Sequence, residues 1–88
     1  MKIREVNENK KQFISLLLLA DEQESMVDRY LEKGTMYVLE DNDVKAECVV
    51  TEEGNEILEI KNIAVDPENQ GKGYGKALID FLASKYAD

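Results

Sequence analysis

One stretch near the end of the chain limits the possible folds more than any other. An apolar run at 56–65 stops at Asp66-Pro67, then three glycines at alternate positions across 71–75 lead directly into a helical pattern. The residue before a proline favours an extended backbone, and proline cannot donate to a sheet, so a strand must end here. Glycines are costly where a helix begins unless the backbone approaches a partner or leaves its N–H groups free. The stretch therefore predicts a strand, a loop with a binding role and a helix.

The rest of the chain alternates between two hydrophobic periods. A period near 3.6 predicts helices at 9–19 and 22–33, and a period of 2 predicts strands at 2–6, 35–40 and 44–51, with a turn at 41–43. The side chains expected on the apolar helix stripes are Phe13, Leu16, Leu17, Ala20, Met26, Val27, Tyr30 and Leu31. Asp21 and Glu24 have the spacing of a capping box, and Gly34 is expected to end the second helix.

Taken in order, these elements predict one α+β domain over residues 1–88. The order is β-α-α-β-β-β-loop-α, with a mainly antiparallel sheet flanked by helices. The last helix is expected to place Tyr74, Ala77, Leu78, Phe81, Leu82 and Tyr86 at spacings of three and four.

Composition excludes several classes of function. The formal net charge of −8 argues against nucleic-acid binding, which needs a basic surface. Histidine is absent, which removes His-containing catalytic triads and zinc sites, and no metal is expected. The single cysteine, Cys48, lies in an apolar strand and is expected to be a buried thiol. No run is long enough to span a membrane, so a cytoplasmic location is the default expectation.

The glycine loop, residues 70–76, admits several interpretations. A flexible connection without a ligand is one. A Walker A loop and a dinucleotide fingerprint both fail on the spacing of their glycines. The remaining interpretation is an anion site, because N–H groups at a helix N-terminus together with the helix dipole attract a pyrophosphate. Lys72 and Lys76 would add positive charge in an otherwise acidic chain.

The motif QGKGYG at 70–75 resembles the (Gln/Arg)-x-x-Gly-x-(Gly/Ala) motif of the GCN5-related N-acetyltransferase (GNAT) family. The preceding strand ending in NIAV, the Asp-Pro pair and the following helix also match, and the element order extends the resemblance over all 88 residues. The stretch at 15–38 resembles the first two helices and following strand of small bacterial members. The resemblance implies an acetyl-CoA-dependent N-acetyltransferase acting on a primary amine of a small molecule or protein.

Site residues follow from the resemblance, position by position. It implies that acetyl-CoA is held by Ile63, Ala64, Val65, Gln70, Gly71, Lys72, Gly73, Tyr74, Gly75 and Lys76. The strand would pair with the pantetheine arm through its main chain, and the loop would hold the pyrophosphate. Glu59 falls where some members carry the general base. A solvated glutamate on an exposed strand face is the competing interpretation. Asn62 and Tyr37 are further candidates to line the site, each with a structural role as the alternative.

The family pattern continues beyond the helix at 74–86 into a fifth strand, a fourth helix and a C-terminal hairpin. We therefore expect this chain to correspond to the N-terminal, cofactor-binding part of a member, a partial acyl-CoA N-acyltransferase-like domain. The strand at 56–65 is then expected to have an unpaired edge, which would favour a homodimer. A non-catalytic CoA-binding or protein-interaction module is the alternative function, and an α+β domain whose loop binds nothing is the third.

Overall fold

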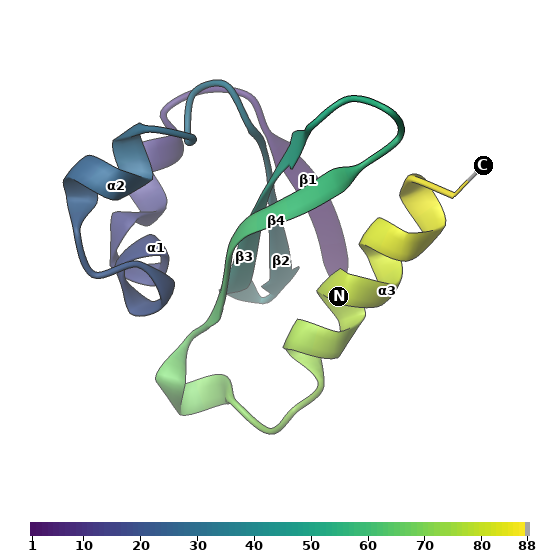
Figure 1. Ribbon diagram of the computed structural model, residues 1–88. Helices are drawn as coiled ribbons and strands as arrows, with labels where there is room; N and C mark the ends of the chain where they lie inside the picture. The colour runs from purple at the N-terminus through teal and green to yellow at the C-terminus, as the bar shows by residue number, and fades with distance from the viewer. Residues whose placement is uncertain (88) are drawn as a thin grey trace.

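The computed structural model describes residues 1–87, and its elements follow the predicted order (Figure 1). The strands are β1 (Lys2–Val6), β2 (Thr35–Asp41), β3 (Asp43–Glu52) and β4 (Leu58–Val65). The α-helices are α1 (Ile14–Ala20), α2 (Glu24–Asp28) and α3 (Tyr74–Lys85), and the 3-10 helices are η1 (Lys10–Phe13) and η2 (Pro67–Asn69). The α+β class and the antiparallel meander are confirmed.

The sheet has the strand order β1-β2-β3-β4, and every neighbouring pair is antiparallel. The β2–β3 turn is formed by Asn42, whose φ of 75° is left-handed. The turn before β4 contains three consecutive left-handed residues, 54–56, so the strand begins at Leu58 rather than at 56. Within residues 1–87, β4 pairs with β3 alone, and its other edge is free as expected.

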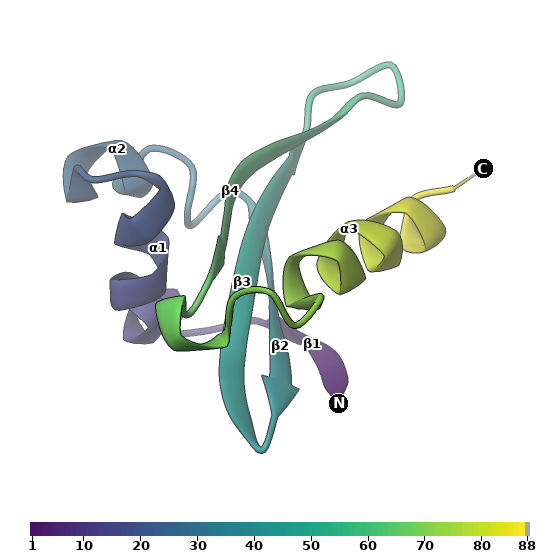
Figure 2. The ribbon, with the colours of Figure 1, turned by 90° about the horizontal axis from the view of Figure 1, so that it is seen from below.

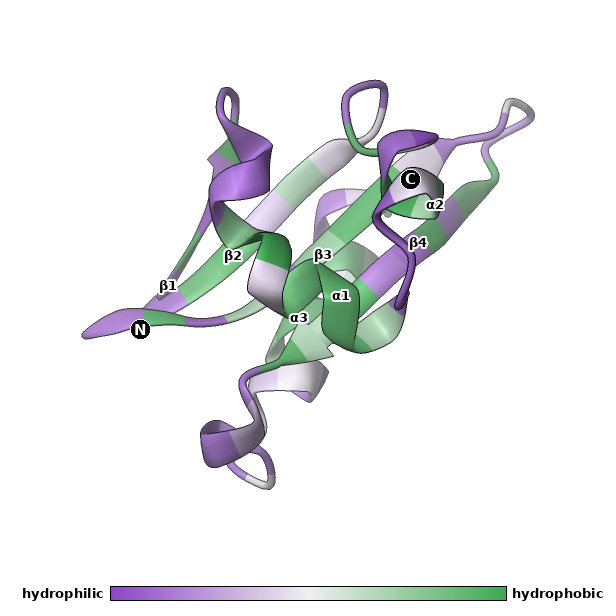
Figure 3. Cartoon of the chain, turned by 90° about the vertical axis from the view of Figure 1, so that its left-hand side faces the viewer, coloured by the Kyte–Doolittle hydropathy of each residue, from purple (hydrophilic) through white to green (hydrophobic). Residues whose placement is uncertain are grey.

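Helices cover the two faces of the sheet separately. Figure 2 shows α1 and α2 on one side of the sheet and α3 on the other. The cluster under α1 and α2 contains Val6, Leu17, Val27, Tyr30, Leu31, Met36, Val38 and Val49. The cluster under α3 contains Tyr37, Leu39, Ala46, Cys48, Val50, Tyr74, Leu78 and Leu82. Hydrophobic residues run along the strands, whereas the helices carry both hydrophobic and hydrophilic residues and the connecting turns are mostly hydrophilic (Figure 3).

The first two helices are shorter than predicted. Residues 10–13 form a 3-10 turn before α1, and α2 ends at Asp28 instead of 33. The capping box is wrong: Gln23 precedes α2, while Asp21 lies at the C-terminal end of α1 and accepts the Tyr30 hydroxyl at 3.2 Å. Met26, expected on the buried stripe, is 38 % exposed. No helix within residues 1–87 is long and apolar enough to cross a bilayer.

Gly34 does follow the second helical segment, but not as the left-handed cap that we expected. Its φ is not among the positive values of the chain. A Cβ at this position would lie 2.8 Å from the Tyr30 carbonyl oxygen and 2.9 Å from Cγ1 of Val49. Glycine is therefore required because the backbone passes directly over β3.

Candidate functional site

A pocket of about 480 Å³ lies where β4 ends, between α1 and α3. Its lining residues are Leu19 and Ala20 at the end of α1, Ile63, Ala64 and Val65 on β4, Gln70 in the glycine loop, and Gly75 and Ile79 on α3. The fold thus brings five of the predicted cofactor residues to one place. The pocket lies between the end of the predicted strand and the beginning of the predicted helix.

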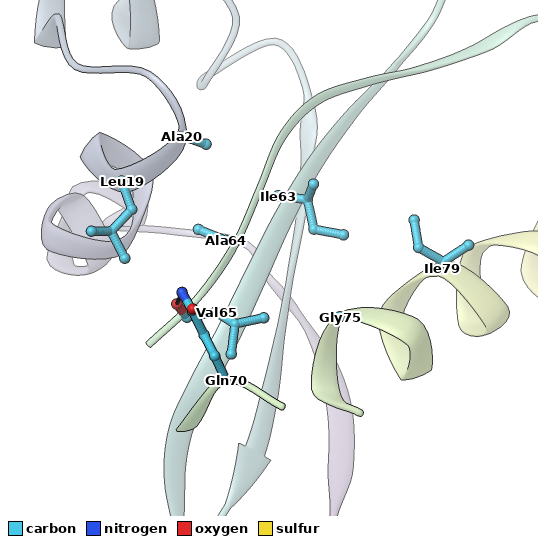
Figure 4. A pocket seen from close by; sticks show the side chains of 8 residues that line it. All are labelled: Leu19, Ala20, Ile63, Ala64, Val65, Gln70, Gly75 and Ile79. Atoms are coloured by element: carbon cyan, nitrogen blue, oxygen red, sulfur yellow. Dashed lines mark hydrogen bonds between the residues drawn. The ribbon is translucent and has the colours of Figure 1, made fainter. Parts of the chain in front are cut away.

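The alternation of β4 gives the pocket two different sides. Ile63 and Val65 point from β4 toward the α3 side, where Ile79 lies, whereas Ala64 points toward Leu19 at the end of α1 (Figure 4). Ala64 is only 8 % exposed. The result is a mostly apolar pocket along the last residues of β4, a strand that has a free edge within residues 1–87.

The glycine loop has a left-handed backbone at two of its glycines. Gly71 and Gly73 have φ values of +81° and +85°, and a Cβ on either would meet nothing within 4 Å. They are therefore glycines for their left-handed backbone, not for lack of space. Gly73 precedes α3 and, within residues 1–87, no side chain caps this end. The first N–H groups of an α-helix have no intrahelical acceptor, so those of residues 74–76 are available to a ligand.

The two loop lysines are placed less specifically. The Lys72 ammonium donates to the Asn69 side-chain oxygen at 3.2 Å. Lys76 forms an exposed ion pair with Asp80, one helical turn later, at 2.7 Å. This hydrogen bond raises the pKa of the Lys76 ammonium above its usual value. Both side chains lie at the surface near the helix N-terminus, where they can exchange these partners for an anion.

Tyr74 fixes the beginning of α3 to the sheet. Its ring is buried in the cluster under α3, and its hydroxyl donates to Asp41 at 2.7 Å, at the end of β2. This hydrogen bond is the main cause of the raised pKa of Tyr74. Tyr74 therefore positions the loop from beneath and does not line the pocket.

We predict that Tyr74→Phe lowers the free energy of unfolding by about 1 to 2 kcal/mol, since it leaves the Asp41 carboxylate without this donor. Urea unfolding of Tyr74→Phe, Asp41→Ala and the double variant measures the pair. The two single effects should not add, because each removes the same hydrogen bond. Additive losses would show that the Tyr74 hydroxyl and the Asp41 carboxylate are not coupled in stability.

Three other candidates from the sequence lie outside the pocket. Glu59 is on β4 with 47 % of its side chain exposed, and it forms an ion pair with Lys61. Tyr37 is buried under α3, where its hydroxyl lies 2.9 Å from that of Tyr86. Asn62 is buried on the opposite face, under α1. Tyr37 and Asn62 are therefore placed as structural residues, the alternative to lining the site.

Sequence reasoning missed Glu47, a fully buried carboxyl on β3. Burial raises its pKa to about 8. The strand pattern VKAECVVT favours a polar face at Glu47, as for an ordinary half-exposed strand. However, β3 is paired on both sides and covered on both faces, and residues 46–51 are all buried. The sequence signal that could have indicated its burial was a single glutamate within an inner strand of the meander.

Within residues 1–87, no group of three or more His, Cys, Asp or Glu side chains is arranged to hold a metal ion. Cys48, the single cysteine, is buried in the cluster under α3 as expected. Burial raises the pKa of its thiol to about 12, so it stays protonated at neutral pH.

Comparison with known proteins adds to this geometry. Residues 32–88 match a family model described as an acetyltransferase (GNAT) domain. The uncharacterized N-acetyltransferase YvbK of Bacillus subtilis is 40% identical over 73 residues, which are 82% of this chain and 47% of the relative.

Two solved structures resemble the whole described fold. An acetyltransferase of Bacillus subtilis in complex with CoA has a TM-score of 0.86 and 34% identity, covering 97% of this chain and 57% of that one. A GNAT family acetyltransferase of Elizabethkingia anophelis with acetyl-CoA bound has a TM-score of 0.85 and 30% identity, covering 97% and 58%. The chain thus spans about half the length of these relatives.

Proposed function

Because the chain belongs to the GNAT acetyltransferase family, we propose that it binds acetyl-CoA as the cofactor-binding part of an N-acetyltransferase. The acceptor in this proposal is a primary amine of a small molecule or protein. The observation that carries it is the pocket at the end of β4, which opens beside the uncapped N-terminus of α3. Relatives with CoA or acetyl-CoA bound share this fold.

In this proposal the glycine loop holds the pyrophosphate. The backbone amides from Gly71 to Gly75 converge on the anion, and the dipole of the twelve-residue helix α3 favours its negative charge. Lys72 and Lys76 lie beside the same helix end and supplement the amides. Gln70 lines the pocket and donates to the Val65 carbonyl at 3.4 Å, which connects the loop to the strand.

The pantetheine arm is proposed to lie along β4. The free edge of this strand offers main-chain groups to an extended ligand, in the manner of an added strand. Ile63, Ala64 and Val65 form the end of the strand and line the pocket. The thioester would then reach the part of β4 nearest the end of α1.

The proposed reaction is direct acetyl transfer in a ternary complex. The amine nitrogen attacks the thioester carbonyl, an N–C bond forms, the C–S bond breaks, and the electron pair leaves with the sulfur. The nitrogen loses one proton, and the departing thiolate takes up one proton. Glu59 is the candidate base that the family resemblance supplies. Its exposed position beside Lys61 requires it to leave that ion pair before it can accept a proton.

A second function remains as an alternative: a non-catalytic CoA-binding or protein-interaction module. The free edge of β4 favours it, because unpaired strand edges bind other chains, and a homodimer through this edge is part of the proposal. The assignment of residues 1–88 to a single partial domain and the cytoplasmic location both stay predictions.

The experiment that tests acetyl-CoA binding is a calorimetric titration of the chain and of Gly73→Val. Valine cannot readily adopt the left-handed backbone of this position, so the loop amides lose their alignment. We expect the affinity to fall by at least about tenfold, since one charge-assisted hydrogen bond contributes roughly 1.5 to 3 kcal/mol.

Gly54→Val is the matched control for this titration. Gly54 has a φ of +82° and no atom within 4 Å of an added Cβ, but it lies in the β3–β4 turn. Both substitutions therefore impose the same backbone strain, and only one touches the loop. Equal affinity of the two variants for acetyl-CoA, or no saturable binding by the folded parent chain, would contradict the proposal.

A further inference from the structure

Three buried oxygen atoms under α1 and α2 lack hydrogen-bond partners within residues 1–87. They are Oε1 and Oε2 of Glu47 and Oδ1 of Asn62. The exposed fraction is 0% for Glu47 and 3% for Asn62, so neither residue reaches solvent to any useful extent. Buried polar atoms are costly unless they are paired. The arrangement therefore requires a donor that an ionised Glu47 cannot supply.

The strand register places the two side chains on the same face of the sheet. Glu47 lies opposite Ala64, and Val49 lies opposite Asn62. Glu47 and Asn62 are thus diagonal neighbours on adjacent antiparallel strands, a separation that a long side chain can bridge. Val49 belongs to the cluster under α1 and α2, which identifies the face that they share.

Asn62 connects this face to the end of α1. Its amide nitrogen donates to the Leu17 carbonyl at 2.9 Å and to the Tyr30 hydroxyl oxygen at 3.0 Å. The Tyr30 hydroxyl in turn donates to Asp21, which directly follows α1. One asparagine therefore holds β4 against α1 and against the segment after α2.

The same contact lies next to the pocket in the sequence of both elements. Leu19 and Ala20, just after Leu17, form one wall, and Ala64, two residues after Asn62, forms the other. A change at the Asn62–Leu17 hydrogen bond would move these walls relative to each other. When Asn62 directs its amide nitrogen at Leu17, its Oδ1 faces the other way, where a buried oxygen needs a donor.

We propose that Glu47 is a positioning residue: in its neutral form it donates its O–H to Oδ1 of Asn62 and thereby fixes the α1 wall of the pocket. The proposal deepens the proposed function and rests on it, because the wall matters for an acetyl-CoA arm that lies along β4. Glu47 does not touch the reacting atoms. It acts through Asn62 and Leu17.

The apolar surroundings of Glu47 keep its carboxyl neutral near pH 7. The adjacent positions on β2 and β4 are Val38 and Ala64, both apolar. The titratable groups that interact with Glu47 are Tyr30 on the helical side and Cys48 next to it on β3. Asp21 interacts with Tyr30, and Lys61, which pairs with Glu59, lies farther along β4. Burial raises the pKa of Glu47 to about 8, so the donor is lost above that pH.

The test follows the Asn62 side-chain amide by NMR from pH 6 to pH 9.5 and measures acetyl-CoA affinity over the same range. In the parent chain we expect the amide signals to shift with a midpoint near pH 8. The acetyl-CoA affinity should fall by about fivefold or more across it, the size of a typical coupling between two sites. Glu47→Gln keeps a neutral donor of the same shape, so both quantities should stay constant with pH.

Two further variants complete the test. Glu52→Gln is the matched control on the same strand and should behave like the parent chain, since Glu52 is exposed at the end of β3. Glu47→Leu has no donor and should bind acetyl-CoA more weakly than Glu47→Gln at every pH. If Glu47→Leu does not fold, the comparison of the parent chain with Glu47→Gln still tests whether Glu47 donates to Asn62.

Failure of the role of Glu47 can be distinguished from failure of the proposed function. An Asn62 amide that does not shift in the parent chain, or that shifts equally in Glu47→Gln, overturns the role of Glu47. An amide that shifts as expected in a chain without acetyl-CoA affinity at any pH supports the hydrogen bond and overturns the proposed function. A shift accompanied by pH-independent affinity overturns the link between Glu47 and the pocket wall.

Discussion

The free energy of unfolding of the parent chain should decrease by up to about 5 kcal/mol, relative to Glu47→Gln, as the pH rises from 4.5 to 8. The pKa of Glu47 is raised from 4.5 to about 8 by burial. Below pH 4.5 the carboxyl is protonated in both the folded and the unfolded chain, so it costs nothing. Between the two values only the folded chain holds the proton, and each pH unit costs roughly 1.4 kcal/mol. Above about pH 8 the difference levels off.

Urea unfolding followed by circular dichroism between pH 4 and pH 9 measures this effect. Taking the difference between the parent chain and Glu47→Gln is necessary because other carboxyls act in the opposite sense. The Arg4 side chain, for example, lowers the pKa of Glu40 through a hydrogen bond, which stabilises the fold as the pH rises. Parallel pH profiles of the two chains would mean that Glu47 is ionised and solvated in the folded protein.

The effect is large for a chain of this size. The free energy of unfolding of a folded domain is roughly 5 to 15 kcal/mol. The ionisation of one buried carboxyl therefore cancels a large part of it. Glu59, by contrast, lies at the surface, where it pairs with Lys61. The two glutamates, twelve positions apart, thus differ because of the strand positions that they occupy.

The second large effect is expected from Leu78→Ala, which should lower the free energy of unfolding by about 2 to 5 kcal/mol. Leu78 is fully buried in the centre of the cluster under α3. Truncation removes its contacts with the sheet and leaves a cavity that the rigid strands cannot close. Because α3 carries the N-terminus of the proposed anion site, loss of stability here also loosens the glycine loop.

Ile79→Ala is the control for Leu78→Ala on the same helix. Ile79 is 43% exposed and lines the pocket at the end of β4. We expect it to change the unfolding midpoint in urea only slightly and to weaken acetyl-CoA binding, whereas Leu78→Ala should change the midpoint strongly. A loss of stability in Ile79→Ala as large as in Leu78→Ala would show that α3 is not held through the face that carries Leu78.

Local patterns were sufficient for the strands, the turns and α3. The turn at Asn42 and the stop at Asp66-Pro67 depend on backbone restrictions of one or two residues, which any chain with these residues shares. The glycine loop was equally readable, since left-handed Gly71 and Gly73 are needed before a helix whose first amides are free. Five predicted cofactor residues, 63–65, 70 and 75, therefore converge on the pocket.

Helix lengths and caps were less readable, because packing overrode local preference. Asp21 has the sequence position of a cap for the second helix, yet its carboxylate accepts from Tyr30 instead. Lys10 is buried and donates to the carbonyls of Leu31 and Gly34, at 2.9 and 2.7 Å, which ties η1 to the segment after α2. The hydrophobic periodicity of a single helix cannot predict this contact, since its partners lie more than twenty residues apart in the sequence.

By itself, then, the sequence determined the order of the elements, the antiparallel meander and the loop at the N-terminus of α3, because these depend on period and backbone freedom over a few residues. Only the tertiary structure decided which side chains share a site. It placed β3 in the middle of the sheet, which buries Glu47, and it joined Asn62 to Leu17 across 45 positions of the chain. Burial and long-range hydrogen bonds are properties of the packed sheet, so the local pattern around Glu47 could not show that this strand glutamate is fully buried.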